Sequence, residues 1–337
     1  MLKIGIIGAG GIGGVHANCY KSIPNAKVIA VADIIPERAK RLADMFQADA
    51  YDNAEDIIKR KDVDVIDICV PTYLHSEFVI KTAKAKKHIL CEKPMALTYD
   101  QGKKMIEETE KHGVKFMVAH VLRFFPEYLS AREAMMNGSI GLAKMVRTYR
   151  GGPNPAIVRE WYGFHEKSGG SIQDSLIHDI DFLTWTFGPV KEVYARGNVF
   201  RRKEPLDPEY DLVMMEFENG VIAHLISDWS GNQKTHFGAK IEIAGTKGLI
   251  EFNSFNSIPL KLNLFEENKG KSESVSIPES PLSPDVEPYT REIREFLESI
   301  ENDSKSPVSV NEALYALKVA LTAIESMRLN RPLEVKL

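Results

Sequence analysis

Three ionisable side chains lie close together in the stretch 169-GGSIQDSLIHDIDFL-183, namely Asp174, His178 and Asp181. Asp174 and His178 are four residues apart, so a helix would place them on one side, about one turn apart. A histidine titrates near neutral pH and can accept a proton, and a carboxylate one turn away can orient it. A solvated helix face, a metal site and an active-site edge all use such residues. Residues 171–187 contain no Lys, Arg or Glu, which favours the active-site edge.

A metal site at this position would need a third ligand. The spacing of Asp174 and His178 suits two ligands on a helix, but no third ligand is evident beside them. The chain has three cysteines, and they are widely spaced with no CxxC pair. Neither a zinc site nor a disulfide framework is expected from that pattern, so we predict no metal.

The start of the chain carries a second pattern with chemical meaning. The apolar run from Lys3 to Ile7 predicts a strand, and it leads directly into 8-GAGGIGG-14. A helix is expected from His16 to Ile23, followed by a strand over residues 27–33. Asp33 ends that strand, 20 residues after Gly13, which is the spacing of a dinucleotide-binding βαβ unit.

Each residue of this unit has a physical role toward a dinucleotide. Gly8 permits the tight turn, Gly10 lets the backbone approach a pyrophosphate, and Gly13 lets the helix pack closely on the strand. The helix N-terminus supplies N–H groups to the phosphates. Asp33 can accept hydrogen bonds from a ribose diol and would repel a 2′-phosphate, so NAD is favoured over NADP. The predicted cofactor-binding residues here are Gly8, Gly10, Gly11, Ile12, Gly13 and Asp33.

The elements that must position these residues alternate regularly. Further strands are expected at 63–70, 88–93 and 115–120, with helices at 38–46, 54–59, 76–87 and 98–113. Such alternation indicates parallel strands with right-handed crossovers, and ligands bind beyond the carboxyl ends of such strands. This rule selects three more segments: 71-PTYLH-75, 92-EKP-94 and 120-HVLRF-124.

The pattern changes after Phe124. Helices are expected at 127–137, 289–300 and 311–328, and strands at 142–152, 190–200, 210–230, 239–253 and 260–265. Tight turns at Glu218-Asn219-Gly220 and 245-GTKG-248 join consecutive strands, which indicates an antiparallel sheet. Residues 268–288 are expected to form a surface loop.

The predicted fold is therefore an α/β Rossmann-type dinucleotide-binding domain followed by an α+β domain with a large, mainly antiparallel sheet. We place the first domain at residues 1–121 and the second, for substrate binding and oligomerisation, at 122–337. A sheet covered by helices on one face leaves its other face for a partner. We expect a homo-oligomer, a dimer or tetramer, built through that sheet.

Bulk properties narrow the class of protein further. The net charge is −4 over 337 residues, and the basic clusters near Lys86 and Arg202 are short, so no nucleic-acid partner is expected. No apolar run approaches the ~18 residues that would span a membrane. Without a secretory leader or a cysteine framework, we expect a cytoplasmic protein.

Together these motifs resemble the glucose–fructose oxidoreductase, inositol dehydrogenase and rhizopine-catabolism (Gfo/Idh/MocA) family, over nearly the whole chain. The segments that carry the resemblance are 8-GAGGIG-13, Asp33, 71-PTYLH-75, 91-CEKPMAL-97, 120-HVLRFFPEY-128 and 169-GGSIQDSLIHDID-181. Family members mostly oxidise a secondary alcohol of a sugar or cyclitol and pass hydride to a nicotinamide. The resemblance implies the same reaction here.

The resemblance also implies roles for individual residues. The catalytic set would be Lys93, Asp174 and His178, which would also touch the substrate. Glu92, Lys93 and Pro94 would position nicotinamide and ribose, across a Lys93–Pro94 peptide that is cis. Pro71, Thr72 and His75 would lie along the cofactor, and Arg123 would reach the substrate.

The residue types suit this chemistry. Oxidation of an alcohol removes its proton while hydride leaves the same carbon, so a general base is required. His178 is the preferred acceptor, with Lys93 stabilising the developing alkoxide, but a lysine of lowered pKa could itself be the base. Trp161, like Tyr162 and Trp229, offers an aromatic face that suits the C–H surface of a sugar, although packing explains these residues equally well.

Two other functions fit the same sequence. One is a catalytically silent nucleotide-binding sensor, against which the joint presence of Lys93, Asp174 and His178 argues. The other is a nicotinamide-dependent glycoside-cleaving enzyme, which would use the same residues and release sugar without net NADH.

Overall fold

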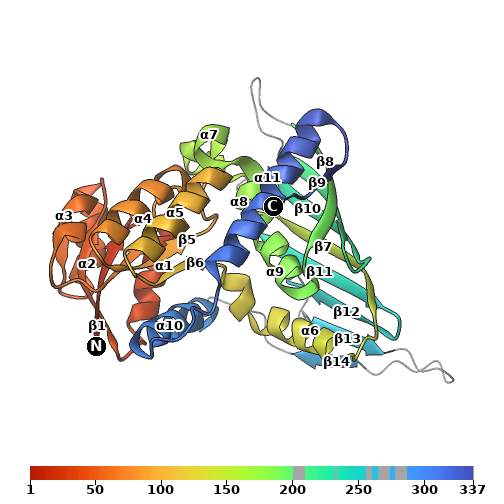
Figure 1. Cartoon of the computed structure of the whole chain (residues 1–337), viewed down its shortest axis with the longest axis horizontal. Helices are drawn as coiled ribbons and strands as arrows, with labels where there is room; N and C mark the ends of the chain where they lie inside the picture. The colour runs from red at the N-terminus through yellow and green to blue at the C-terminus, as the bar shows by residue number, and fades with distance from the viewer. Residues whose placement is uncertain (200–208, 232–233, 256–259, 265–273, 278–286, 337) are drawn as a thin grey trace. The chain divides into compact units, whose positions relative to one another are not determined.

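The computed structural model describes residues 1–199, 209–231, 234–255, 260–264, 274–277 and 287–336. Two compact units make up the chain (Figure 1): Met1–Val121 with Val286–Leu314, and Leu122–Asp285 with Tyr315–Leu337. The basic cluster at Arg202 lies outside the described residues. So does most of the predicted loop at 268–288, within which the structure describes one short strand.

The first unit contains a six-stranded sheet in the order β3-β2-β1-β4-β5-β6, and every strand pair in it is parallel. Its central strands are buried on both faces, as Ile4, Ile6 and Ile66 show with no exposed surface. The strands are β1 (Leu2–Ile7), β2 (Ala26–Ala32), β3 (Asp49–Tyr51), β4 (Val65–Ile68), β5 (His88–Glu92) and β6 (Phe116–Ala119). The predicted Rossmann-type fold is confirmed.

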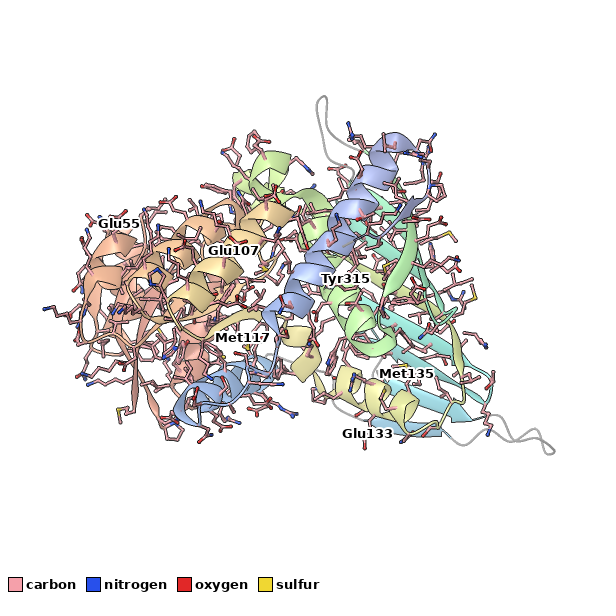
Figure 2. All side chains as sticks on the ribbon, in the orientation of Figure 1. Glu55, Glu107, Met117, Glu133, Met135 and Tyr315 are labelled. Carbon is pink, nitrogen blue, oxygen red and sulfur yellow. The ribbon has the colours of Figure 1, made fainter. Side chains whose placement is uncertain are left out.

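Helices connect and cover these strands: α1 (Gly11–Tyr20), α2 (Pro36–Asp44), α3 (Ala54–Lys59), α4 (His75–Lys84) and α5 (Tyr99–Lys111). Helix α5 begins with a capping box, in which the Thr98 and Gln101 side chains bond each other's backbone N–H. Met117 on β6 is fully buried and Glu107 on α5 is exposed (Figure 2), as expected of a sheet under amphipathic helices.

Two helices of the first unit differ from expectation. The first helix was predicted to start at His16, but α1 starts at Gly11, so the glycine-rich segment forms its first turn. Helix α10 (Glu287–Glu301) was assigned by sequence to the second domain. In the structure it packs against α1 in the first unit (Figure 1), because its buried stripe, including Ile293 and Phe296, faces that helix.

The second unit contains a mixed, mostly antiparallel sheet, with nine strands among the described residues, in the order β14-β13-β12-β11-β7-β10-β9-β8-β15. Among the strand pairs of this sheet that the structure describes, only β7–β10 is parallel. The strands are β7 (Ala143–Pro153), β8 (Val190–Asn198), β9 (Tyr210–Phe217), β10 (Ile222–Gly231), β11 (Gly238–Gly245), β12 (Gly248–Asn253), β13 (Leu260–Leu264), β14 (Ser274–Ile277) and β15 (Leu333–Glu334). The predicted large sheet is confirmed.

Helices cover one face of this sheet. They are α6 (Pro126–Met136), α9 (Ile177–Phe187) and most of α11 (Val310–Leu329), which stand beside the strands in Figure 1. Tyr128 of α6 packs edge-on against Phe182 of α9 at 5.0 Å and against Phe252 of β12 at 5.6 Å between ring centroids. These aromatic contacts join both helices to the sheet.

The opposite face of the sheet carries apolar side chains that are exposed in the single chain. Met145, Leu212, Met214 and Ile222 are 40–51% exposed. They lie on the neighbouring strands β7, β9 and β10, with Ile222 opposite Met145 in the register. Among the described residues, no helix combines the length and the apolar character that crossing a bilayer requires.

Candidate functional site

The glycine-rich segment has the geometry that a dinucleotide needs. Gly8 has a φ of 98°, and a Cβ there would clash with the backbone of Cys69. A Cβ on Gly13 would clash with the carbonyl oxygen of Gly8, whereas one on Gly10 would meet nothing within 4 Å. Gly8 and Gly13 therefore permit close backbone packing, and Gly10 faces open space where a pyrophosphate could approach.

The N-terminus of α1 is available to an anion. No side chain caps this helix at Gly10, and its first turn contains no acidic residue. The carboxylate of Asp33, just after β2, is held beside the same loop. The Ala9 N–H donates to Asp33 Oδ2 at 2.7 Å, and the Ile35 N–H donates to Oδ1 at 2.9 Å. The residues of this loop fit the pyrophosphate and ribose of a dinucleotide.

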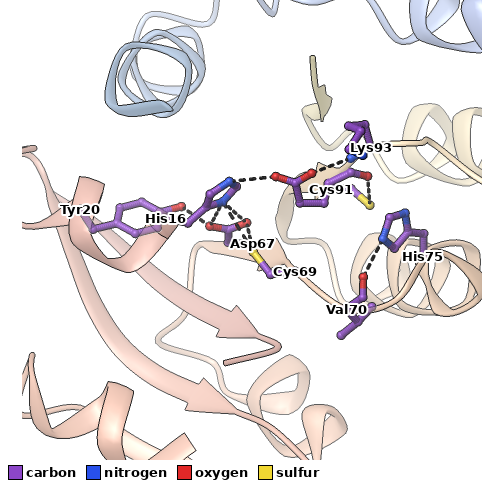
Figure 3. Close-up of polar contacts among 9 residues, drawn as sticks. His16, Tyr20, Asp67, Cys69, Val70, His75, Cys91 and Lys93 are labelled. Carbon is purple, nitrogen blue, oxygen red and sulfur yellow. Dashed lines mark hydrogen bonds and ion pairs between the residues drawn. The ribbon is translucent and has the colours of Figure 1, made fainter. Parts of the chain in front are cut away.

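The segment after β5 is tied to the end of the adjacent strand β4. The Lys93–Pro94 peptide is cis, as the resemblance implied. His75 lies between the two strand ends (Figure 3), with Nε2 2.9 Å from the carbonyl oxygen of Val70 and Nδ1 2.9 Å from that of Pro94. Burial lowers the pKa of His75. His75 thus connects the 71–75 and 92–94 segments of the predicted cofactor site, and Thr72 beside it is also buried.

The carboxylate of Glu92 is used within the fold. Its Oε1 lies 3.1 Å from Nε2 of His16, and its Oε2 accepts a hydrogen bond from the Lys93 N–H at 3.0 Å. Neither His16 nor its partner Asp67 was identified from the sequence as a site residue. The available signal was an acid in the middle of the apolar run 63-VDVIDICV-70.

The stretch that carries Asp174, His178 and Asp181, considered above as one helix, forms two helices, α8 (Gly170–Asp174) and α9. Between them the Leu176 N–H donates to the Ser171 carbonyl five residues earlier, so the backbone widens by one residue for a turn. Asp174 ends α8 and is 8% exposed, and His178 lies in the first turn of α9 and is partly exposed. Lys93 belongs to the first unit, and Asp174 and His178 belong to the second.

Helix α9 is held by two buried ion pairs. Arg123 donates through Nε and Nη2 to Asp181 at 2.8 and 2.7 Å, and both side chains are almost fully buried. Arg150 of β7 donates to Asp179 at 2.7 Å. The expected substrate residue Arg123 thus has a carboxylate partner, and Asp181 pairs with this arginine. Sequence reasoning did not identify the Arg150–Asp179 pair.

Three aromatic residues of the second unit form a cluster. Trp161 stacks on Tyr162 with ring centroids 3.8 Å apart, and Tyr162 meets Trp229 edge-on at 6.0 Å. Trp161 is half-buried, whereas Trp229 is only 8% exposed. A partly exposed indole on a fixed aromatic neighbour could contact the C–H face of a sugar ring.

Known proteins match both parts of the chain. Residues 2–120 match the family described as "Oxidoreductase family, NAD-binding Rossmann fold", and residues 128–251 match the "GFO/IDH/MocA C-terminal domain". The uncharacterized oxidoreductase YrbE of Bacillus subtilis is 30% identical over 341 residues, which cover 98% of this chain and 96% of that protein. The chain belongs to the Gfo/Idh/MocA family of NAD(P)-dependent oxidoreductases, and its first unit is the NAD-binding Rossmann domain.

Two further proteins are similar to this chain over nearly their whole length. The myo-inositol 2-dehydrogenase of Thermotoga maritima is 28% identical over 340 residues, which cover 99% of each chain. The structure of levoglucosan dehydrogenase in complex with NADH and levoglucosan superposes with a TM-score of 0.90 at 23% identity, covering 99% of each chain. The second similarity shows the fold alone.

Proposed function

We propose that this protein oxidises a secondary alcohol of a sugar, cyclitol or sugar derivative and transfers the hydride to NAD. The observation that carries the proposal is the placement of Lys93 at the carboxyl end of β5 in an NAD-binding Rossmann domain, where such folds bind their ligands. His75 ties that strand end to the end of β4, which would hold the lysine segment still beside the cofactor.

The proposed residue roles follow the chemistry of alcohol oxidation. NAD, when bound, supplies the hydride acceptor, and Gly8, Gly10, Gly11, Ile12 and Gly13 would hold its pyrophosphate. Asp33 would accept hydrogen bonds from the ribose diol, which disfavours NADP.

We propose that Lys93, Asp174 and His178 carry the catalytic roles. His178 would accept the alcohol proton, Asp174 would orient His178 or a substrate hydroxyl, and Lys93 would stabilise the alkoxide. Trp161 would contact the sugar ring, with Pro71, Thr72, His75 and Pro94 along the cofactor. For Arg123, the ion pair with Asp181 supports an indirect role, in which the arginine fixes α9 and thereby His178.

A substrate panel followed by one variant tests this proposal. Cyclitols, aldoses, sugar acids and anhydrosugars are scored for NADH formation at 340 nm, and a polyol that reduces NAD is the expected result. Lys93→Ala should then abolish turnover while the affinity for NADH, measured by fluorescence quenching, stays within about threefold. Lys84→Ala, an exposed lysine on α4, is the matched control. Undiminished turnover by Lys93→Ala would exclude the assignment.

Two other functions give different results in the same assay. A catalytically silent sensor would bind NADH but reduce no NAD with any compound. A glycoside-cleaving enzyme that uses NAD transiently would release sugar from a glycoside without net NADH, which chromatography of the products detects.

We also propose a homo-oligomer, a dimer or tetramer, built through the open face of the second unit's sheet. The exposed apolar residues Met145, Leu212, Met214 and Ile222 support it, because a patch of neighbouring apolar side chains on a sheet commonly marks an interface. Sedimentation equilibrium should give a multiple of 37.8 kDa for the wild type and a smaller mass for Met214→Asp. A wild-type mass of one chain would exclude the proposal.

A further inference from the structure

A buried cluster of charged side chains lies inside the first unit. His16 of α1 and Asp67 of β4 have no exposed surface, and Glu92 of β5 is 8% exposed. Figure 3 shows the His16 ring beside the Asp67 carboxylate, and the other ring nitrogen of His16 lies 3.1 Å from Glu92 Oε1. Burying charged groups is costly unless they are paired, so a cluster of this kind needs a compensating arrangement.

Both nitrogens of the His16 ring face carboxylate oxygens. Nδ1 lies 3.0 Å from Oδ2 and 3.2 Å from Oδ1 of Asp67, and Nε2 lies 3.1 Å from Oε1 of Glu92. A neutral imidazole has one N–H and could serve only one of these acids. An imidazolium has two, so it can donate through Nδ1 to Asp67 and present its second N–H and its charge to Glu92. The geometry therefore calls for a protonated ring.

The groups around the cluster are consistent with that state. Burial alone would lower the pKa of His16, but the Asp67 charge and the hydrogen bonds to Asp67 and Cys69 raise it well above the ordinary value. Asp67 also accepts hydrogen bonds from the Tyr20 hydroxyl at 3.0 Å and the Cys69 thiol at 3.4 Å. On the remaining side, the Tyr289 ring of α10 is 6.3 Å from the imidazole.

The second acid connects this buried charge to Lys93. Burial would raise the pKa of the Glu92 carboxyl, but His16, the Lys93 charge and the Lys93 N–H together hold it below its usual value. The oxygen of Glu92 that does not face His16 accepts the Lys93 N–H. A continuous row of polar contacts thus runs from β4 through α1 to the backbone of residue 93.

We propose that His16 is a positioning residue, an imidazolium that fixes the Glu92 carboxylate and through it the backbone of Lys93. The inference rests on the proposed function, because Lys93 is the residue proposed to act on the alcohol. The arrangement explains how an acid next to the catalytic lysine can stay ionised while facing inward. A neutral residue at position 16 would leave Glu92 buried without its cation, so the carboxylate would protonate or rotate away.

A metal ion is the competing occupant of the same cluster. His16, Asp67 and Cys69 each offer a ligand atom, and these atoms lie within 4.8 Å of one another. A metal would require the Cys69 thiolate. Burial and the neighbouring Asp67 charge raise the pKa of that thiol, and it already donates to Asp67, so the hydrogen-bonded cluster is favoured. A stoichiometric metal in the purified protein, measured by mass spectrometry, would overturn the proposal.

The first test needs no enzymatic activity. The protein is labelled with ¹⁵N-histidine, and the His16 ring is identified by the shift that Tyr20→Phe causes through Asp67. The ¹⁵N chemical shifts of both His16 ring nitrogens should keep imidazolium values from about pH 6 to 9. In the Glu92→Gln variant these values should be lost at a lower pH than in the wild type. A neutral His16 ring at pH 7 in the wild type would overturn the proposal, whether or not a substrate has been found.

The second test is a double-mutant cycle on turnover. His16→Gln and Glu92→Gln should each lower kcat about 10–100-fold, the size seen when an orienting partner of a site residue is removed. The KM for NAD should stay within about threefold. Because His16 acts through Glu92, the double variant should be no slower than the slower single variant, to within about twofold.

Tyr20→Phe is the control variant for this cycle. Tyr20→Phe removes a hydrogen bond to Asp67 in the same cluster and should lower the melting temperature while kcat stays within about twofold. Multiplicative losses in the double variant, or a His16→Gln kcat within twofold of wild type, would reduce His16 to a packing role. A wild type that oxidises no polyol would instead refute the proposed function, and the NMR measurement would still decide the state of His16.

Discussion

The ion pair between Arg123 and Asp181 offers a direct measure of what holds helix α9 in place. The guanidinium donates two hydrogen bonds of 2.7 and 2.8 Å, and the side chains of Arg123 and Asp181 are only 3% and 1% exposed. Removing one partner leaves a buried, uncompensated charge, which typically costs about 3–5 kcal/mol. We therefore expect Arg123→Met and Asp181→Leu each to lower the free energy of unfolding by about that amount.

Removing both partners should cost far less. In the double variant Arg123→Met/Asp181→Leu no buried charge remains, and apolar replacements of buried ion pairs are often neutral or stabilising. At about 2–4 °C per kcal/mol for a unit of this size, each single variant should lose roughly 6–20 °C in melting temperature and the double variant much less. The comparison is made by differential scanning calorimetry.

A surface pair supplies the control. Lys40 and Asp44 on α2 are 2.8 Å apart but mostly exposed, so Asp44→Asn should leave the melting temperature nearly unchanged. Single variants of the buried pair that melt within 2 °C of wild type would refute the reasoning. A loss of melting temperature in the double variant that equals the sum of the two single losses would also refute it. If Arg123→Met instead raised the substrate KM without lowering the melting temperature, Arg123 would bind the substrate directly.

Three further predictions concern cofactor choice, the base and pH. Asp33→Ala should lower kcat/KM for NAD roughly 10–100-fold, because charge-assisted hydrogen bonds to the ribose are lost. The kcat/KM for NADP should be spared. A wild type that prefers NADP would contradict it. His178→Ala should lower kcat about 10²–10⁴-fold and change the pH–rate profile; an unchanged profile would transfer the base role to Lys93. Burial raises the pKa of Glu127 from 4.5 to about 7 in the fold. The fold therefore retains that proton, and the free energy of unfolding falls as pH rises from about 4.5 to 7. Calorimetry should find Glu127→Gln more stable than wild type at pH 8, by about 3 kcal/mol, and equal at pH 4.5; equal stability at pH 8 would contradict the prediction.

The sequence alone determined the parts of this protein that depend on short-range pattern. These parts are the glycine spacing at 8–13, the acid at the end of the second strand, and the alternation of strands and helices. Each can be read from the residue pattern within single elements and their turns. Because all strands of the first sheet run parallel, the position of Lys93 at a carboxyl end followed without further information. The turn at Asn219-Gly220 and the strand alternation similarly predicted the sheet of the second unit.

Tertiary structure alone decided which charged groups meet. His16 and Asp67 are 51 residues apart, and Arg123 and Asp181 are 58 apart. No local period relates residues at such separations, and each chain segment carried other charges with which they could have paired. The packing of α10 on α1 depends in the same way on which apolar stripes find one another. The position of Lys93, the lysine that we propose for catalysis, could be read from its strand. The buried histidine that we propose holds its neighbour Glu92 became visible only when α1, β4 and β5 were packed together, because a buried charge takes its partner from the fold.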